Sequence, residues 1–358
     1  MSPMTDPQSA GTVPRCHVSI IIKAFNEEKN ICAAIESSLA AVAEVGGEVI
    51  LADSHSTDHT VELASQYPIR IVRLVHANER CCGAGPQLGY QHSRGEYVYV
   101  MDGDMQMLRG FLPRALMFLA QHPEAAGVGG RLVERNSESL EYRERALRNA
   151  AHLAPGEVDR LDGGGLYRRM AIEESRYLSD RNLRSYEEFD LAVRLRVLGW
   201  KLWRIPVDSV THYGHDAPPY RLLMRRWQTG YVCGLGQLVR ACAGEPRMPV
   251  VLRTLKEVRL YTAVLLWWAL MLSVPFWPLP WTARAVSGLA LLAAPFAIML
   301  MRKRSLVRAC YSVISWCVHA AGMVRGFLTA RRPPRERIPS QVVHEPPQAT
   351  ESRRQHYA

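Results

Sequence analysis

The chain has 358 residues, of which 48% are hydrophobic and 22% are charged, and its formal net charge is +10. This length and composition exclude a disordered chain, a collagen and a small disulfide scaffold. The charge is divided unevenly, because residues 1–219 hold 24 basic and 29 acidic side chains (net −5), whereas residues 220–358 hold 20 basic and 5 acidic ones (net +15).

The N-terminal half shows the pattern of an α/β domain. Residues 1–15 are polar and are expected to form a flexible tail without a signal peptide, so that the following domain stays in the cytosol. Short apolar runs suited to strands then alternate with helical patterns; the runs are 18–22, 48–52, 69–75 and 96–101, and the helical patterns are 31–45, 58–67 and 86–93. This alternation predicts a mostly parallel sheet flanked by helices, in a domain over residues 16–219.

Two of the expected strands end in acidic side chains. Asp53 ends the second strand, and the turn Asp102-Gly103-Asp104 ends the fourth. Parallel sheets bind ligands beyond the carboxyl ends of their strands. Two carboxylates one residue apart supply oxygen ligands for Mg²⁺ or Mn²⁺, which proteins commonly hold together with substrate phosphates. An ordinary turn has the same short motif, so the position in the sheet is what favours a metal site.

Six segments in order resemble the motifs of the family 2 glycosyltransferases. They are Ala24-Phe-Asn-Glu-Glu28, Asp53-Ser-His-Ser-Thr-Asp-His-Thr60, residues 95–104, Gly163-Gly-Gly-Leu-Tyr-Arg-Arg169, residues 187–195 followed by Gly199-Trp-Lys201, and Thr211-His-Tyr-Gly214. The resemblance covers about residues 18–216. It implies a GT-A fold, which is a nucleotide-binding α/β sheet with an Asp-x-Asp-type metal site, in a membrane-anchored bacterial enzyme of polysaccharide or glycolipid synthesis.

The resemblance also implies which residues bind the nucleotide sugar. Asn26 and Glu27 correspond to the loop near the nucleotide, and Asp102 corresponds to a residue that faces the ribose or the metal. Asp53 matches the acid that holds the base or the ribose. Ser54 stands where many members have a second Asp, and this departure leaves the nucleotide base open.

The metal shell implied by the resemblance consists of Asp102, Asp104 and His212. The bound Mg²⁺ or Mn²⁺ would neutralise the leaving diphosphate as a Lewis acid. His212 would complete the metal shell or contact the diphosphate, although a lone histidine is also a common packing residue.

An inverting transfer requires a general base that takes the proton of the acceptor hydroxyl. The family uses the Asp of a Glu-Asp pair, and the matching residue here is Glu188. Asp190 is the second candidate for the base. Either carboxylate could instead stabilise the start of a helix, because acidic side chains are favourable in a first helical turn.

Four residues are expected on the acceptor and diphosphate side, namely Arg168, Glu187, Arg226 and Trp227. Arg168 and Glu187 belong to the matching segments described above. Arg226-Trp227 fits the end of the Gln-x-x-Arg-Trp pattern of membrane-bound members, but Leu223 replaces its Gln.

The basic C-terminal half predicts a membrane-associated region. Residues 220–258 are basic, aromatic and amphipathic, which suits the plane of an anionic membrane. Two apolar runs separated by Arg284 predict two transmembrane helices over residues 259–302, with buried core helices as the alternative. A third apolar helix is expected over residues 303–330; basic residues at both of its ends favour an interfacial position over a third span. Residues 331–358 are expected to be a disordered basic tail.

Together these patterns predict a metal-dependent, inverting glycosyltransferase at the cytoplasmic face of the inner (plasma) membrane. Its expected partners are a nucleotide-sugar donor, a lipid-linked (polyprenyl) glycan acceptor and membrane lipid, and no nucleic acid. One alternative is a polyprenyl-phosphate glycosyltransferase that makes a lipid-linked monosaccharide. An alternative of another class is a catalytically inactive membrane scaffold or sugar-nucleotide sensor, for which Ser54 and Glu188 are the only sequence indications.

Overall fold

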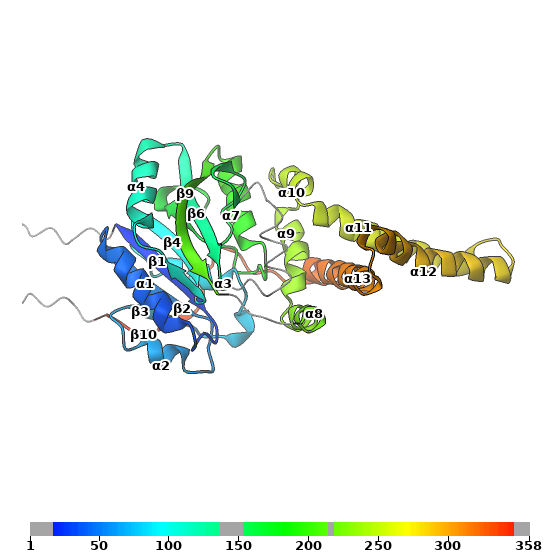
Figure 1. Ribbon diagram of the computed structural model, residues 1–358, viewed down its shortest axis with the longest axis horizontal. Helices are drawn as coiled ribbons and strands as arrows, with labels where there is room; N and C mark the ends of the chain where they lie inside the picture. Colours follow the sequence, from blue (N-terminus) through cyan, green and yellow to red (C-terminus); the bar gives the residue numbers. More distant parts are fainter. Residues whose placement is uncertain (1–16, 136–152, 214–217, 347–358) are drawn as a thin grey trace, which may run out of the picture.

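The computed structural model describes residues 17–135, 153–213 and 218–346. A mixed sheet flanked by helices forms one end of the molecule, and apolar helices extend away from it on one side (Figure 1). The strand order is β10-β3-β2-β1-β4-β8-β6-β9-β5, and β7 pairs with β9. The strands are β1 (Val18–Ala24), β2 (Gly47–Asp53), β3 (Arg70–Leu74), β4 (Tyr97–Asp102), β5 (Met105–Met107), β6 (Ala125–Glu134), β7 (Gly156–Val158), β8 (Gly165–Arg168), β9 (Lys201–His212) and β10 (Ser340–His344).

Strand β1 shows why the sequence forms this sheet. Its apolar run is buried on both faces, since Ile20 and Ile22 belong to one core cluster whereas Ile21 belongs to another. Both faces are covered by helices, as expected for a parallel sheet. The helices of this half are α1 (Ile31–Ala43), α2 (Thr60–Ala64), α3 (Ala84–Tyr90), α4 (Phe111–Gln121), α6 (Arg169–Glu174) and α7 (Glu187–Val197), with the short 3₁₀ helix η1 (Ala77–Glu79).

The parallel strands fix where ligands can bind. Strands β2 and β4 both pair in parallel with β1, and β3 pairs in parallel with β2, so their carboxyl ends share one edge. The chain runs outward from β1 to β2 and β3 on one side and returns to β4 on the other. The point where the strand order reverses therefore lies between β1 and β4, which is where open α/β sheets place their ligands. The strands beyond β4 pair mostly antiparallel, so the sheet is mixed.

The C-terminal half consists of helices. They are α8 (Pro219–Gln228), η3 (Tyr231–Cys233), α9 (Gly234–Cys242), α10 (Met248–Thr254), α11 (Lys256–Ser273), η4 (Val274–Phe276), α12 (Trp281–Lys303) and α13 (Leu306–Leu328). Three segments are long and apolar enough to cross a membrane, namely Lys256–Phe276, Trp281–Lys303 and Leu306–Leu328. The third is 23 residues long, includes Arg308 and Arg325, and lies within the expected bounds 303–330.

Helix α13 packs very closely against α9 and η3. A Cβ atom on Gly236 would lie 1.8 Å from the carbonyl oxygen of Met323, and one on Gly326 would lie 2.0 Å from that of Cys233. Only glycine fits at these two positions. One core cluster contains Phe189 of α7, Leu238 of α9 and Ala320 of α13, so the helical half is joined to the sheet half by a shared apolar core.

The C-terminal segment differs from the expected disordered tail. After α13 the chain returns along the sheet half, and β10 pairs antiparallel with β3 at the edge of the sheet (Figure 1). Ser340 lies opposite Leu74, and Val342 lies opposite Val72. The edge strand β3 supplies the backbone hydrogen-bond partners of β10. The sequence of the basic, proline-containing tail does not indicate this pairing by itself.

Candidate active site

A pocket of about 590 Å³ opens at the carboxyl ends of β1 and β4. This volume is in the range of small-molecule and cofactor sites. Its lining comes from both halves of the chain. The sheet half supplies Lys23, Ala24, Phe25 and Glu27 at and after the end of β1, Ser54 after β2, Ala77, Asn78, Arg80, Cys81, Cys82 and Gly85 after β3, Asp102, Gly103 and Asp104 at and after the end of β4, and Arg184. The helical half supplies Arg225, Gln228, Thr229 and Tyr231 at and after the end of α8. The sheet therefore supplies one wall, and the start of the helical half supplies another.

A lysine that no motif in the sequence marks lines both this pocket and a smaller cavity beside it. Lys23 Nζ lies 3.0 Å from Asp102 Oδ1 and 3.2 Å from Glu187 Oε1. Burial alone would lower the pKa of Lys23, but the carboxylates of Asp102 and Glu187 raise it well above its usual value. Lys23 therefore stays cationic and partly neutralises both acids. Its signal in the sequence is a single charge near the end of the otherwise apolar strand β1.

Asp104 belongs to a chain of three polar side chains. Antiparallel pairing of β5 with β9 sets Met105 opposite His212, next to Asp104. The Nε2 atom of His212 lies 3.3 Å from Asp104 Oδ2, and its Nδ1 atom lies 2.7 Å from Glu134 Oε2. Although burial would lower the pKa of His212, hydrogen bonds and charge interactions with Asp104 and Glu134 raise it to about 10. Glu134, at the end of β6, has no motif of its own in the sequence.

The donor set of the pocket suits a hard divalent cation that shares its shell with a ligand. Asp102 and Asp104 both line the pocket and offer carboxylate oxygens. Among the described residues, no group of three His, Cys, Asp or Glu side chains is arranged to hold a metal ion by itself. Magnesium and manganese sites built from one or two carboxylates plus substrate phosphates have this incomplete protein shell.

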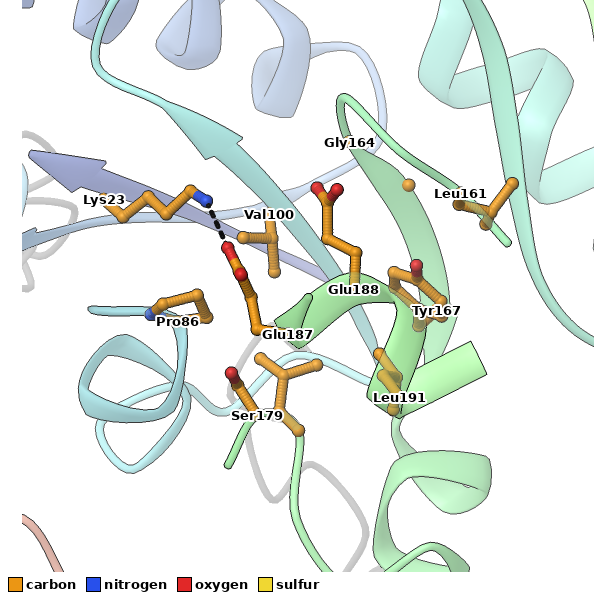
Figure 2. Close-up of a pocket in the computed structure, with 12 residues that line it drawn as sticks. Lys23, Pro86, Val100, Leu161, Gly164, Tyr167, Ser179, Glu187, Glu188 and Leu191 are labelled. Carbon is orange, nitrogen blue, oxygen red and sulfur yellow. Dashed lines mark hydrogen bonds and ion pairs between the residues drawn. The ribbon is translucent and has the colours of Figure 1, made fainter. Parts of the chain in front are cut away.

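The two glutamates at the start of α7 lie beside a second, small cavity of about 30 Å³. Figure 2 shows Lys23 pointing at Glu187, and Glu188 beside Tyr167 and Gly164. The backbone N–H of Gly163 donates to Glu188 Oε1 at 3.3 Å. Burial, together with the charge of Asp162 and against the opposing charge of Lys23, raises the pKa of Glu188 to about 8. Glu188 is thus a carboxylate that holds its proton up to unusually high pH.

Asp190 and Arg168 have their side chains in structural contacts. Asp190 is fully buried and lies 2.9 Å from Arg194 Nε and 2.5 Å from Arg247 Nη1. Arg168 donates to the carbonyl oxygens of Ala125, Leu119 and His122. Neither residue lines either of the two cavities. These placements leave Glu188 as the candidate base.

The residues expected at the nucleotide fall into two groups. Glu27 lines the pocket. Asn26 instead accepts hydrogen bonds from the backbone N–H and the hydroxyl of Thr57, and so links the loops after β1 and β2. Asp53 is fully buried, where it accepts from the backbone N–H of Ser56 and pairs with Arg73 Nε at 3.1 Å. Asn26 and Asp53 thus shape the loops that border the pocket.

One wall of the pocket is rich in arginine. Arg80, Arg184 and Arg225 all line the pocket, and Arg80 stacks over the ring of Phe25 at 3.7 Å from its centroid. Arg226 lies over the ring of Tyr231, and Trp227 lies under Arg325 of α13. Arg226 and Trp227 therefore join α8 to its neighbours, whereas Arg225 faces the pocket.

Comparisons with known proteins agree with this architecture. Residues 19–176 match the family described as Glycosyl transferase family 2. The probable glucomannan 4-beta-mannosyltransferase 15 of Arabidopsis thaliana is 29% identical over 166 residues, which cover 42% of this chain and 30% of that protein. The undecaprenyl-phosphate 4-deoxy-4-formamido-L-arabinose transferase of Pectobacterium carotovorum is 30% identical over 117 residues, which cover 31% of this chain and 36% of that protein. The chain thus spans about a third of the length of these curated relatives.

A solved structure shares the fold. A mannosyltransferase from Pyrobaculum calidifontis, in complex with GDP-Man and Mn²⁺, superposes with a TM-score of 0.56 at 19% sequence identity. The superposition covers 88% of each chain, so the likeness extends beyond the residues that the family match covers. The expected GT-A-type α/β fold is therefore confirmed.

Proposed function

We propose, from the match of residues 19–176 to the family described as Glycosyl transferase family 2, that the chain transfers a sugar from a nucleotide-sugar donor to a lipid-linked glycan acceptor. The observation that carries the proposal is the 590 Å³ pocket, in which the carboxylates of Asp102 and Asp104 face the same space as Arg80, Arg184 and Arg225. A metal-bound diphosphate and a membrane-bound acceptor could meet in such a pocket.

Asp102 and Asp104 would hold the divalent cation, which is Mg²⁺ or Mn²⁺. Such a cation stabilises the negative charge of a leaving diphosphate. His212 is the third candidate ligand, and it would have to lose its proton first, because only a neutral imidazole binds a metal. The complex of the Pyrobaculum calidifontis mannosyltransferase with GDP-Man and Mn²⁺ supports a divalent ion in this fold.

Glu188 is the proposed general base. Its raised pKa makes it a stronger base than an ordinary glutamate, which suits removal of a proton from an acceptor hydroxyl. The proton would move from the hydroxyl to the carboxylate as the new glycosidic bond forms, with inversion at the sugar carbon. Lys23 would keep Asp102 and Glu187 from repelling the anionic donor.

The arginine-rich wall is the proposed acceptor side. Guanidinium groups match phosphate oxygens in two-pronged geometry, so Arg80, Arg184 and Arg225 suit the phosphate of a lipid-linked acceptor. We place residues 16–219 on the cytoplasmic side of the inner membrane. The reason is that basic residues such as Arg302, Lys303 and Arg304 mark the cytoplasmic ends of membrane helices.

A second candidate acceptor is bare polyprenyl phosphate. The names of two relatives contain such a lipid phosphate. They are the undecaprenyl-phosphate 4-deoxy-4-formamido-L-arabinose transferase described above and the dolichol-phosphate mannosyltransferase of Pyrococcus furiosus. The resulting product would be a lipid-linked monosaccharide, and the same arginines would bind the lipid phosphate.

One experiment separates these functions. The purified full-length chain is incubated with a panel of nucleotide sugars, Mg²⁺ or Mn²⁺, and either polyprenyl phosphate or a polyprenyl-diphosphate-linked sugar. Turnover with only the prebuilt lipid-linked sugar supports the first proposal, and turnover with the bare lipid phosphate supports the second. Nucleotide binding without turnover on any acceptor, with Asp104→Ala and Glu188→Gln equal to wild type, would instead support an inactive scaffold or sensor.

A further inference from the structure

The segment that follows α13, residues 329–346, runs along the sheet half as an extended strap and lies outside the family match. Its last part is β10, which pairs with β3 at the edge of the sheet (Figure 1). We propose that this strap positions one wall of the nucleotide-sugar pocket through the contact of Arg332 with Glu79. The inference rests on the function proposed above for that pocket.

Two side-chain amides fix the strap to the domain. Asn182 Oδ1 accepts from the backbone N–H of Arg332 at 2.8 Å, and Asn182 Nδ2 donates to the carbonyl oxygen of Arg332 at 2.9 Å. Gln91 binds Ile338 in the same way, at 2.8 Å and 3.2 Å. The side chain of Ile338 is buried. Each amide satisfies both backbone polar groups of one strap residue, so the strap is held in a single register.

Glu79 is the point where the strap meets the pocket loop. It is the last residue of η1, and its side chain is only 9% exposed. Its carboxylate accepts hydrogen bonds from the buried Arg181 and from Arg332 Nη1, the latter at 2.5 Å. A buried carboxylate is stable only with charged or hydrogen-bonding partners. One of these partners comes from the domain, and the other comes from the strap.

The neighbours of Glu79 face the opposite way, into the pocket. Ala77, Asn78 and Arg80 all line the pocket, whereas the side chain of Glu79 contacts the strap. Because these residues share one tight 3₁₀ turn, a shift of Glu79 would move Asn78 and Arg80 with it. Glu79 and Arg332 are therefore positioning residues, which act on the pocket through its loop without touching the ligand. The strap also connects the end of α13 directly to the donor site.

The test compares two arginine substitutions in the full-length chain. Arg332→Ala removes the contact with Glu79 but leaves Arg181 in place, so the buried carboxylate keeps one partner. Arg335→Ala is the matched control: it removes the same charge from the same strap, at an exposed side chain for which the described residues provide no partner. Arg332→Lys restores the charge, so the hydrogen exchange of residues 77–82 and the KM should return part of the way to their wild-type values.

Two measurements decide the outcome. Hydrogen exchange at residues 77–82 should be faster in Arg332→Ala than in Arg335→Ala, and KM for the nucleotide sugar should rise about threefold to tenfold while kcat changes less. Unchanged exchange at residues 77–82 in Arg332→Ala would overturn the inference, whether or not the chain turns over a nucleotide sugar. Faster exchange with an unchanged KM would also overturn it, because the strap would then order the loop without positioning the donor. Absence of nucleotide-sugar binding in the wild type would refute the proposed function alone.

Discussion

Replacing Glu188 by glutamine removes the proposed base and should lower kcat/KM by about 100- to 10,000-fold. The wild type should also show a characteristic pH profile. A general base works only when deprotonated, and burial together with the charge of Asp162 raises the pKa of Glu188 to about 8. Activity should therefore rise with pH, reach about half of its maximum near pH 8 and level off above about pH 9. For a single group of that pKa the deprotonated fraction is about one eleventh at pH 7 and about ten elevenths at pH 9, a gain of about tenfold.

A variant of Asp162 tests the cause of this shift. Asp162→Asn removes one of the negative charges that raise the pKa of Glu188, so the rising limb of the profile should move to lower pH. Asp159→Asn is the matched control, because Asp159 also pairs with Arg160 but does not contribute to the shift of Glu188. The assay is transfer from a labelled nucleotide sugar between pH 5.5 and 9.5. Wild-type rates in Glu188→Gln, or a profile already flat at pH 6, would refute the assignment.

Three further predictions concern the metal, the buried ion pairs and the helix contact. Asp104→Ala should abolish the divalent-ion dependence of donor binding in calorimetry, whereas Asp208→Ala, which removes an exposed carboxylate paired with Arg131, should leave it intact. Arg247→Ala leaves the buried Asp190 with Arg194 as its one remaining ion-pair partner and should lower the free energy of unfolding by about 3–5 kcal/mol in denaturant unfolding. Arg247→Lys keeps the charge and should lower it less. Equal stability of wild type and Arg247→Ala would contradict the ion-pair argument. Gly326→Ala should lower the thermal stability in detergent by about 1–3 kcal/mol, because its Cβ would meet the backbone of Cys233. Gly288→Ala is the control and should leave the stability unchanged, because the nearest neighbour of its Cβ would lie at 3.8 Å.

Local features were predictable where a single segment carries the signal. The run Val18-Ser-Ile-Ile-Ile22 predicted the strand β1, and the acidic turn at Asp102 and Asp104 predicted the edge at which the pocket lies. Helix α13 spans Leu306–Leu328 and so lies within the expected bounds 303–330, and it includes Arg308 and Arg325.

Features that depend on distant pairing were not predictable. Glu134 joins His212 only because β6 and β9 lie side by side, and the two residues are 78 positions apart. Asp190 is a candidate base by its sequence segment, but Arg247, 57 positions later, holds it in a buried ion pair. Strand β10 depends on an open edge at β3, about 270 positions earlier. Such contacts follow from tertiary packing, which no local pattern encodes.

The return of the chain to β3 limits how it can thread through a bilayer. Strands β9 and β10 belong to one sheet, and all three apolar helices lie between them. A polypeptide that leaves one side of a membrane and must come back to it crosses an even number of times. Three complete crossings are therefore excluded, and at most two of α11, α12 and α13 can traverse the bilayer. Since β10 follows all three helices in the chain, the sheet gains this edge strand only after these helices have been synthesised.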